Sequence, residues 1–163
     1  MSNNILFVFE GASTEVQIIK NLNKVLINDK LTVHCVYGAE IYQIFKQIKI
    51  DEDLDTFNLL KERSYENSII LENYTRDDFA EIYLFFDYDG HSIIADDEKL
   101  NELLYFFNEE TEKGKLYISY PMVEALKHIS NHSDFKESNV ECKQKINYKK
   151  VVSEEALNEL IDF

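Results

Sequence analysis

The sequence has little of what stabilises disulfide-rich, fibrous or membrane proteins. Its two cysteines, Cys35 and Cys142, form no CxxC pair, so we expect neither a disulfide framework nor a cysteine zinc site. One proline and four glycines are too few for a long disordered segment. The first apolar run ends at Glu10, well short of a signal-peptide core or a membrane span. These absences predict a cytoplasmic globular protein with no membrane contact.

Basic residues are also scarce. Lys and Arg number 17 against 31 Asp and Glu, which gives a formal net charge of −14. Nucleic-acid affinity normally comes from Lys and Arg that displace counterions, so a nucleic-acid partner requires bound divalent metals, a basic partner or a basic segment. The one basic stretch is either an arm that contacts a phosphate backbone or a boundary before another segment; it contains Lys143, Lys145, Tyr148, Lys149 and Lys150.

What the chain does contain predicts one α/β domain. Its 163 residues are 45% hydrophobic, with 11 Phe and 10 Tyr, enough for a single core. Strand and helix patterns alternate, which is typical of a mostly parallel sheet flanked by helices. The expected strands are 5–9, 31–37, 82–86 and 116–118. The expected helices are about 13–27, 41–48, 57–73, 97–107 and 122–129.

Acidic residues follow several of the predicted strands. Glu10 follows the first strand, Asp87 and Asp89 follow the apolar run 82–86, and Glu124 opens the helix after strand 116–118. Ligands of open α/β sheets bind outside the carboxyl ends of the strands. Each acid alone could be a turn former or a helix-dipole partner, but carboxylates gathered at one edge repel one another unless a cation lies between them. Oxygen ligands of this kind favour Mg²⁺ or Mn²⁺.

The same residues carry a family resemblance. The segment Phe7-Val8-Phe9-Glu10-Gly11, with Thr14-Glu15 opening the next helix, and the segment Phe85-Phe86-Asp87-Tyr88-Asp89 resemble the glutamate and DxD motifs of the Toprim domain. Topoisomerases, primases and the overcoming-lysogenization-defect (OLD) nucleases share this catalytic module. The stretch from Tyr120 to His128 is similar to the Pro, Glu and His pattern of RloB-like Toprim proteins, which occur among bacterial anti-phage genes.

The resemblance implies a metal-dependent nuclease acting on DNA or RNA in anti-phage defence. It implies that Asp87 and Asp89 hold a divalent metal, that Glu10 is a further ligand or a general acid/base, and that Glu15 and Glu124 are ligands of a second metal. It covers 1–132 and leaves 133–163 as a C-terminal extension of a chain that could be truncated. Many topoisomerases and primases continue the motif as DxDxD, whereas this chain has His91 there, which disfavours a strand-passing topoisomerase.

Several alternatives stay open at this stage. The segment from Phe85 to Gly90 also resembles the motif of haloacid-dehalogenase (HAD) phosphatases, with Asp87 as nucleophile, although His91 replaces the usual Thr. A third reading is a non-catalytic subunit that binds a partner protein. His91, Lys127 and His128 are further site candidates as phosphate contacts, proton relays or hydrogen-bond partners, or else ordinary polar residues. A zinc site at Glu124, His128 and His132 lacks an evident fourth ligand. The sequence leaves the oligomeric state open.

Overall fold

A computed structural model of the chain describes residues 4–11, 32–51, 53–88, 92–119, 150 and 152. The strands are β1 (Asn4–Phe9), β2 (Thr32–Val36), β3 (Phe79–Asp87), β4 (Asn108–Glu109) and β5 (Gly114–Ser119). They form one sheet in the order β2-β1-β3-β5-β4, in which the first four are parallel and the short β4 pairs antiparallel with β5. The prediction of a mostly parallel sheet is confirmed, and each expected strand falls on an observed one.

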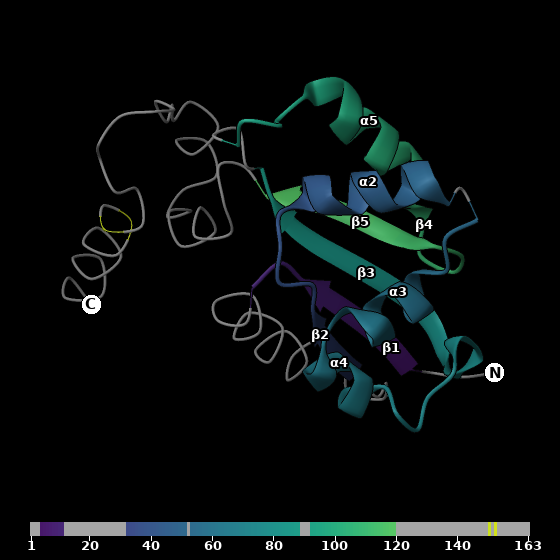
Figure 1. Ribbon diagram of the computed structural model, residues 1–163. Helices are drawn as coiled ribbons and strands as arrows, with labels where there is room; N and C mark the ends of the chain where they lie inside the picture. The colour runs from purple at the N-terminus through teal and green to yellow at the C-terminus, as the bar shows by residue number, and fades with distance from the viewer. Residues whose placement is uncertain are drawn as a thin grey trace, which may run out of the picture.

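The described helices cover one face of this sheet, as Figure 1 shows. They are α2 (Ile41–Ile50), α3 (Thr56–Arg63), α4 (Tyr65–Ile70), the 3₁₀ helix η1 (Arg76–Asp78) and α5 (Asp97–Phe106). Asp55 accepts hydrogen bonds from the first amides of α3, and Asp96 accepts one from Glu98 in the first turn of α5. These side chains satisfy amides that the helices leave without partners, which sets where both helices begin.

The helix expected over 57–73 is in fact two short helices. Ser64 has φ −147° and ψ 159°, an extended conformation that ends α3, and its side chain accepts a hydrogen bond from the Asn67 amide to start α4. Serine is a favoured N-cap because its short side chain reaches the first turn of the helix it precedes. The prediction of one continuous helix here is therefore wrong.

The central strands are apolar on both faces. In β1, Leu6 and Val8 belong to the large core between the sheet and the described helices. Ile5, Phe7 and Phe9 are buried on the opposite face, where Tyr83 and Phe85 of β3 pack beside them. Phe85 stacks against Phe9 at 5.7 Å between ring centroids. Burial on both faces explains why the run 5–9 has no polar alternation.

Gly114 begins β5 with φ 113°, a conformation that L side chains rarely adopt. A Cβ atom at this position would lie 2.6 Å from Leu84 Cδ1 on the neighbouring β3. Glycine is therefore required here both by the backbone conformation and by the close approach of the core.

The predicted helices 13–27 and 122–129 lie outside the described residues. So does the extension 133–163, apart from Lys150 and Val152. Among the described helices, none has the length and apolar character needed to cross a membrane.

Candidate functional site

The sheet has a switch point between its two central strands. From β1 the chain continues to β2 on one side, and it returns to form β3 on the other side of β1. Such a reversal leaves a crevice at the carboxyl ends of the two strands, where ligands of α/β proteins bind. Glu10 directly follows β1, and Asp87 is the last residue of β3. These two of the sequence-predicted acids therefore flank the switch point.

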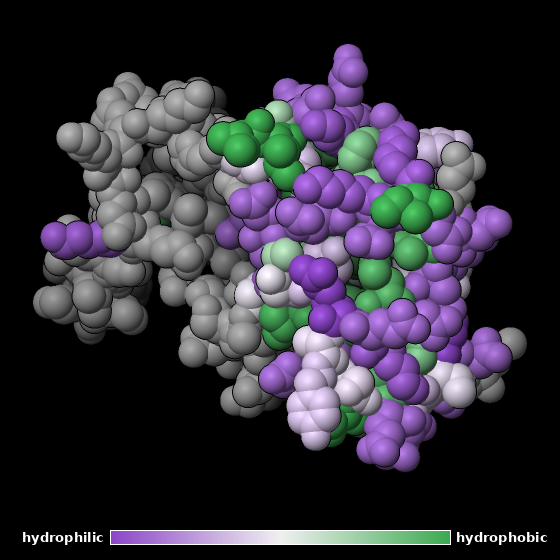
Figure 2. Space-filling view, in the orientation of Figure 1, coloured by the Kyte–Doolittle hydropathy of each residue, from purple (hydrophilic) through white to green (hydrophobic). Residues whose placement is uncertain are grey.

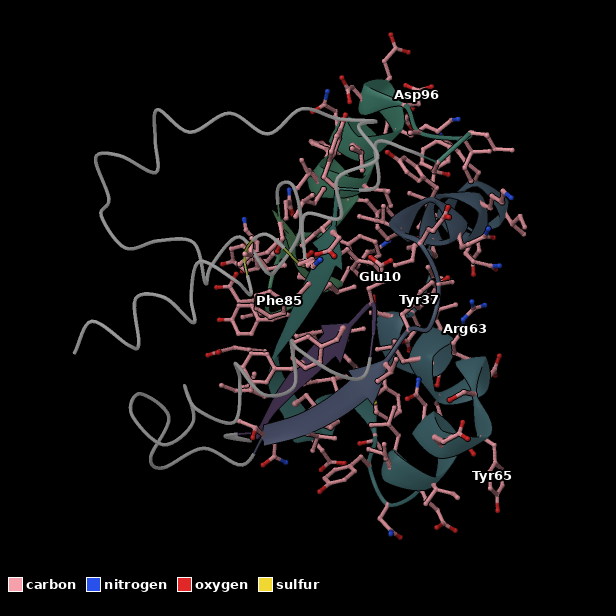
Figure 3. All side chains as sticks on the ribbon, turned by 90° about the vertical axis from the view of Figure 1, so that its left-hand side faces the viewer. Glu10, Tyr37, Arg63, Tyr65, Phe85 and Asp96 are labelled. Carbon is pink, nitrogen blue, oxygen red and sulfur yellow. The ribbon has the colours of Figure 1, made fainter. Side chains whose placement is uncertain are left out.

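Glu10 is held there by its backbone and by its side chain. Its amide donates to the carbonyl oxygen of Phe85 at 3.2 Å, and its carbonyl accepts from the Gly38 amide at 3.0 Å. Its Oε2 atom accepts a hydrogen bond from the Asp87 amide at 3.1 Å. Figure 3, which looks toward the carboxyl ends of the strands, shows Glu10 between Phe85 on one side of the sheet and Tyr37 on the other. The carboxylate is thus aimed across the switch point toward β3.

Asp87 is partly buried and ends the pairing of β3 with β5, opposite Ser119. The next amide, that of Tyr88, donates to the Ser119 carbonyl at 2.8 Å, so the backbone stays aligned one residue beyond the strand. Pairing with β5 on one side and the bond of the Asp87 amide to the Glu10 carboxylate on the other fix where the Asp87 side chain leaves the sheet. The DxD motif therefore begins on a rigid strand end.

Two hydrogen-bonded pairs surround this edge. Tyr88 donates from its hydroxyl to Asp97 Oδ1 at 3.0 Å, and Ser92 donates from Oγ to Glu40 Oε2 at 2.9 Å. They tie the segment after β3 to α5 and to the start of α2. Glu40 was not among the predicted site residues. It nevertheless follows β2 closely, so the rule that picked out Glu10 and Asp87, an acid close after a strand end, also points to Glu40.

The end of β2 is held by groups that the sequence did not single out. Asn67, with 1% of its surface exposed, accepts from the Val36 amide at 3.3 Å and donates from Nδ2 to the Val36 carbonyl at 2.9 Å and the Leu60 carbonyl at 3.1 Å. The side-chain amide thus pairs with the outer edge of β2 as a neighbouring strand would. Arg63 donates from Nε to the Tyr37 carbonyl at 3.0 Å and lies 4.4 Å from the centre of the Tyr37 ring.

Burial suppresses ionisation of the groups beneath the site. It raises the pKa of the Cys35 thiol from 9.0 to about 12, which keeps the sulfur protonated at neutral pH. A protonated, fully buried thiol is neither a nucleophile nor a metal ligand. Burial also raises the pKa of Tyr37, and the Arg63 charge opposes this in part. Both groups are therefore uncharged at neutral pH.

Of the predicted site residues, the structure brings Glu10 and Asp87 together. The others lie outside the described residues: Glu15, Asp89, His91, Glu124, Lys127 and His128. Within the described ranges, no three His, Cys, Asp or Glu side chains are close enough to share a metal ion. Comparisons with family models, with curated proteins and with solved structures give no match.

Proposed function

We propose that the chain is a divalent-metal-dependent nuclease with a Toprim-like site at the β1/β3 switch point. The hydrogen bond from the Asp87 amide to the Glu10 carboxylate supports this best, because it joins the glutamate motif and the DxD motif, 77 residues apart in the chain. Acids that follow adjacent parallel strands at a switch point lie where α/β proteins bind their ligands.

The described donors suit Mg²⁺ or Mn²⁺. Mg²⁺ keeps several water molecules and is usually bound through one or two carboxylates, so Glu10 and Asp87 are a sufficient protein contribution. Asp89, Glu15 and Glu124 are the proposed further ligands. A divalent cation bound there would stabilise the negative charge that develops on the phosphate during phosphodiester cleavage.

Glu10 is proposed either to bind the metal or to move a proton in the reaction. Its hydrogen bond from Asp87 fixes the direction of the carboxylate, so no side-chain ordering is needed when substrate arrives. His91, Lys127 and His128 are proposed to contact phosphate or to hydrogen-bond the carboxylates. The role in bacterial anti-phage defence rests on the RloB-like resemblance of the sequence.

A cleavage assay with several substrates tests the reaction class. We expect the purified chain to cut DNA or RNA with Mg²⁺ or Mn²⁺ and to be inactive in EDTA. Single- and double-stranded DNA and RNA should each be tested, alongside p-nitrophenyl phosphate as a phosphomonoester.

Two other results would contradict the nuclease proposal. Hydrolysis of p-nitrophenyl phosphate without cleavage of any nucleic acid would identify a HAD-like phosphatase. Failure to hydrolyse either kind of substrate would favour the hypothesis that the chain is a non-catalytic subunit that binds a partner protein.

A further inference from the structure

A groove of about 640 Å³ lies between the C-terminal halves of α2 and α5. Because both helices start at the carboxyl ends of strands, these halves lie toward the opposite edge of the sheet from Glu10 (Figure 1). The surface of α2 and α5 around the groove is mainly hydrophilic in Figure 2. The groove therefore lies outside the site described above and is assigned no role by it.

The residues that line this groove carry a net positive charge, whereas the chain as a whole is negatively charged. The protein carries a formal net charge of −14, yet the groove is lined by two lysines, Lys49 and Lys113, and one acid, Glu102. Lys49 forms an ion pair with Glu102, and the Lys113 ammonium lies 4.0 Å from the centre of the Phe106 ring. Because Glu102 offsets the charge of Lys49, the lining carries one net positive charge, which favours an anionic ligand at one place on an acidic protein.

The groove also offers an aromatic platform. Tyr105 lines it with 81% of its surface exposed, next to the partly buried Phe106. Exposed aromatic rings beside lysines are the features by which proteins hold single-stranded nucleic acid, since bases stack on the rings and phosphates lie near the ammonium groups. We propose that this groove binds single-stranded nucleic acid, with a base on Tyr105 and phosphates beside Lys49 and Lys113.

This inference rests on the proposed nuclease function. The groove would be a second place, besides the switch point, where the chain contacts its substrate. The ten residues of α2 span about 15 Å at 1.5 Å per residue. The segment before α2 is bonded to Glu10 through the Gly38 amide, so the helix runs from the switch point to the groove. About four or five stacked nucleotides at 3.4 Å each would cover this length.

Binding of labelled oligonucleotides in EDTA tests the groove separately from cleavage. Fluorescence anisotropy with 12-nucleotide oligo-dT and oligo-U should show that Tyr105→Ala weakens binding by at least about fivefold, while Tyr105→Phe binds like the wild type because stacking is kept. Exchanging both Lys49 and Lys113 for glutamine should reduce the slope of log affinity against log salt by about 1.4, or about 0.7 for each lost phosphate contact.

Tyr65→Ala is the matched control, because Tyr65 on α4 is 76% exposed and lies outside the groove. This variant should bind like the wild type. Equal affinities of Tyr105→Ala and wild type, or equal weakening by Tyr65→Ala, would overturn the proposal. The binding assay contains no metal, so it does not depend on cleavage. If Tyr105→Ala weakens binding but the wild type cuts no nucleic acid, the binding groove is supported and the proposed nuclease function is contradicted. If the wild type cuts nucleic acid but Tyr105→Ala binds it equally well, the nuclease function is supported and the binding groove is contradicted.

Discussion

Glu10→Gln and Asp87→Asn should each lower the rate of metal-dependent cleavage by about 10²- to 10⁴-fold, the range typical of a lost catalytic acid or base. Both changes remove a negative charge from the switch point and leave the fold intact. Glutamine at position 10 can still accept the hydrogen bond of the Asp87 amide, and asparagine at position 87 keeps that amide as donor. The loss should therefore be chemical, and it should appear in single-turnover rates with a saturating metal concentration.

Asp97→Asn is the control for charge at this edge. Asp97 is exposed, accepts the Tyr88 hydroxyl, and keeps an acceptor as asparagine. Its cleavage rate should stay close to that of the wild type. Circular dichroism and thermal unfolding should show that all three variants are folded. A wild-type rate in folded Asp87→Asn would remove the basis for a site at the switch point.

Asn67→Leu should lower the free energy of unfolding by about 3 kcal/mol. The change keeps the number and branching of the side-chain heavy atoms, although two methyl groups take more room than the amide. It leaves the Val36 amide, the Val36 carbonyl and the Leu60 carbonyl without their partner. A buried polar group left unsatisfied costs about 1–3 kcal/mol, and partial relaxation keeps the total below the sum of three. For a domain of this size, the melting temperature should fall by roughly 6–12 °C.

Urea unfolding followed by far-ultraviolet circular dichroism measures this effect. Asn101→Leu is the matched control, since Asn101 is exposed on α5 and its replacement should change stability by less than about 0.5 kcal/mol. A loss below about 1 kcal/mol in Asn67→Leu would mean that Asn67 does not hold the edge of β2.

Local patterns were sufficient to predict the four parallel strands and the two described acids. The runs 5–9 and 82–86 are apolar on both faces because β1 and β3 are central strands, and an acid after each such run falls at the carboxyl edge of the sheet. The strand-end rule therefore found Glu10 and Asp87 without knowledge of the strand order. Their adjacency depends on that order, which the sequence alone does not specify.

The missed features depend on contacts between distant residues. Ser92 and Glu40 are 52 residues apart, and Asn67 contacts Val36 across 31 residues, so no local spacing reveals either pair. The break at Ser64 lies in the polar middle of the segment 57–73, where no proline or glycine marks a helix end. The Asn67 amide donates a hydrogen bond to the Ser64 side chain, and the Asn67 side chain bonds to β2. Both contacts favour a new helix that begins after Ser64. β4 has only two residues, too few for a recognisable pattern.

Titration with Mn²⁺ is the most direct test of the claim that Glu10 and Asp87 hold a divalent metal. Isothermal titration calorimetry or the loss of the free-ion signal in electron paramagnetic resonance would give the affinity in the absence of substrate. We predict that wild type and Asp97→Asn bind Mn²⁺ alike, and that Glu10→Gln and Asp87→Asn bind it at least about tenfold more weakly. Equal Mn²⁺ affinity in all four proteins would contradict a metal site at the switch point.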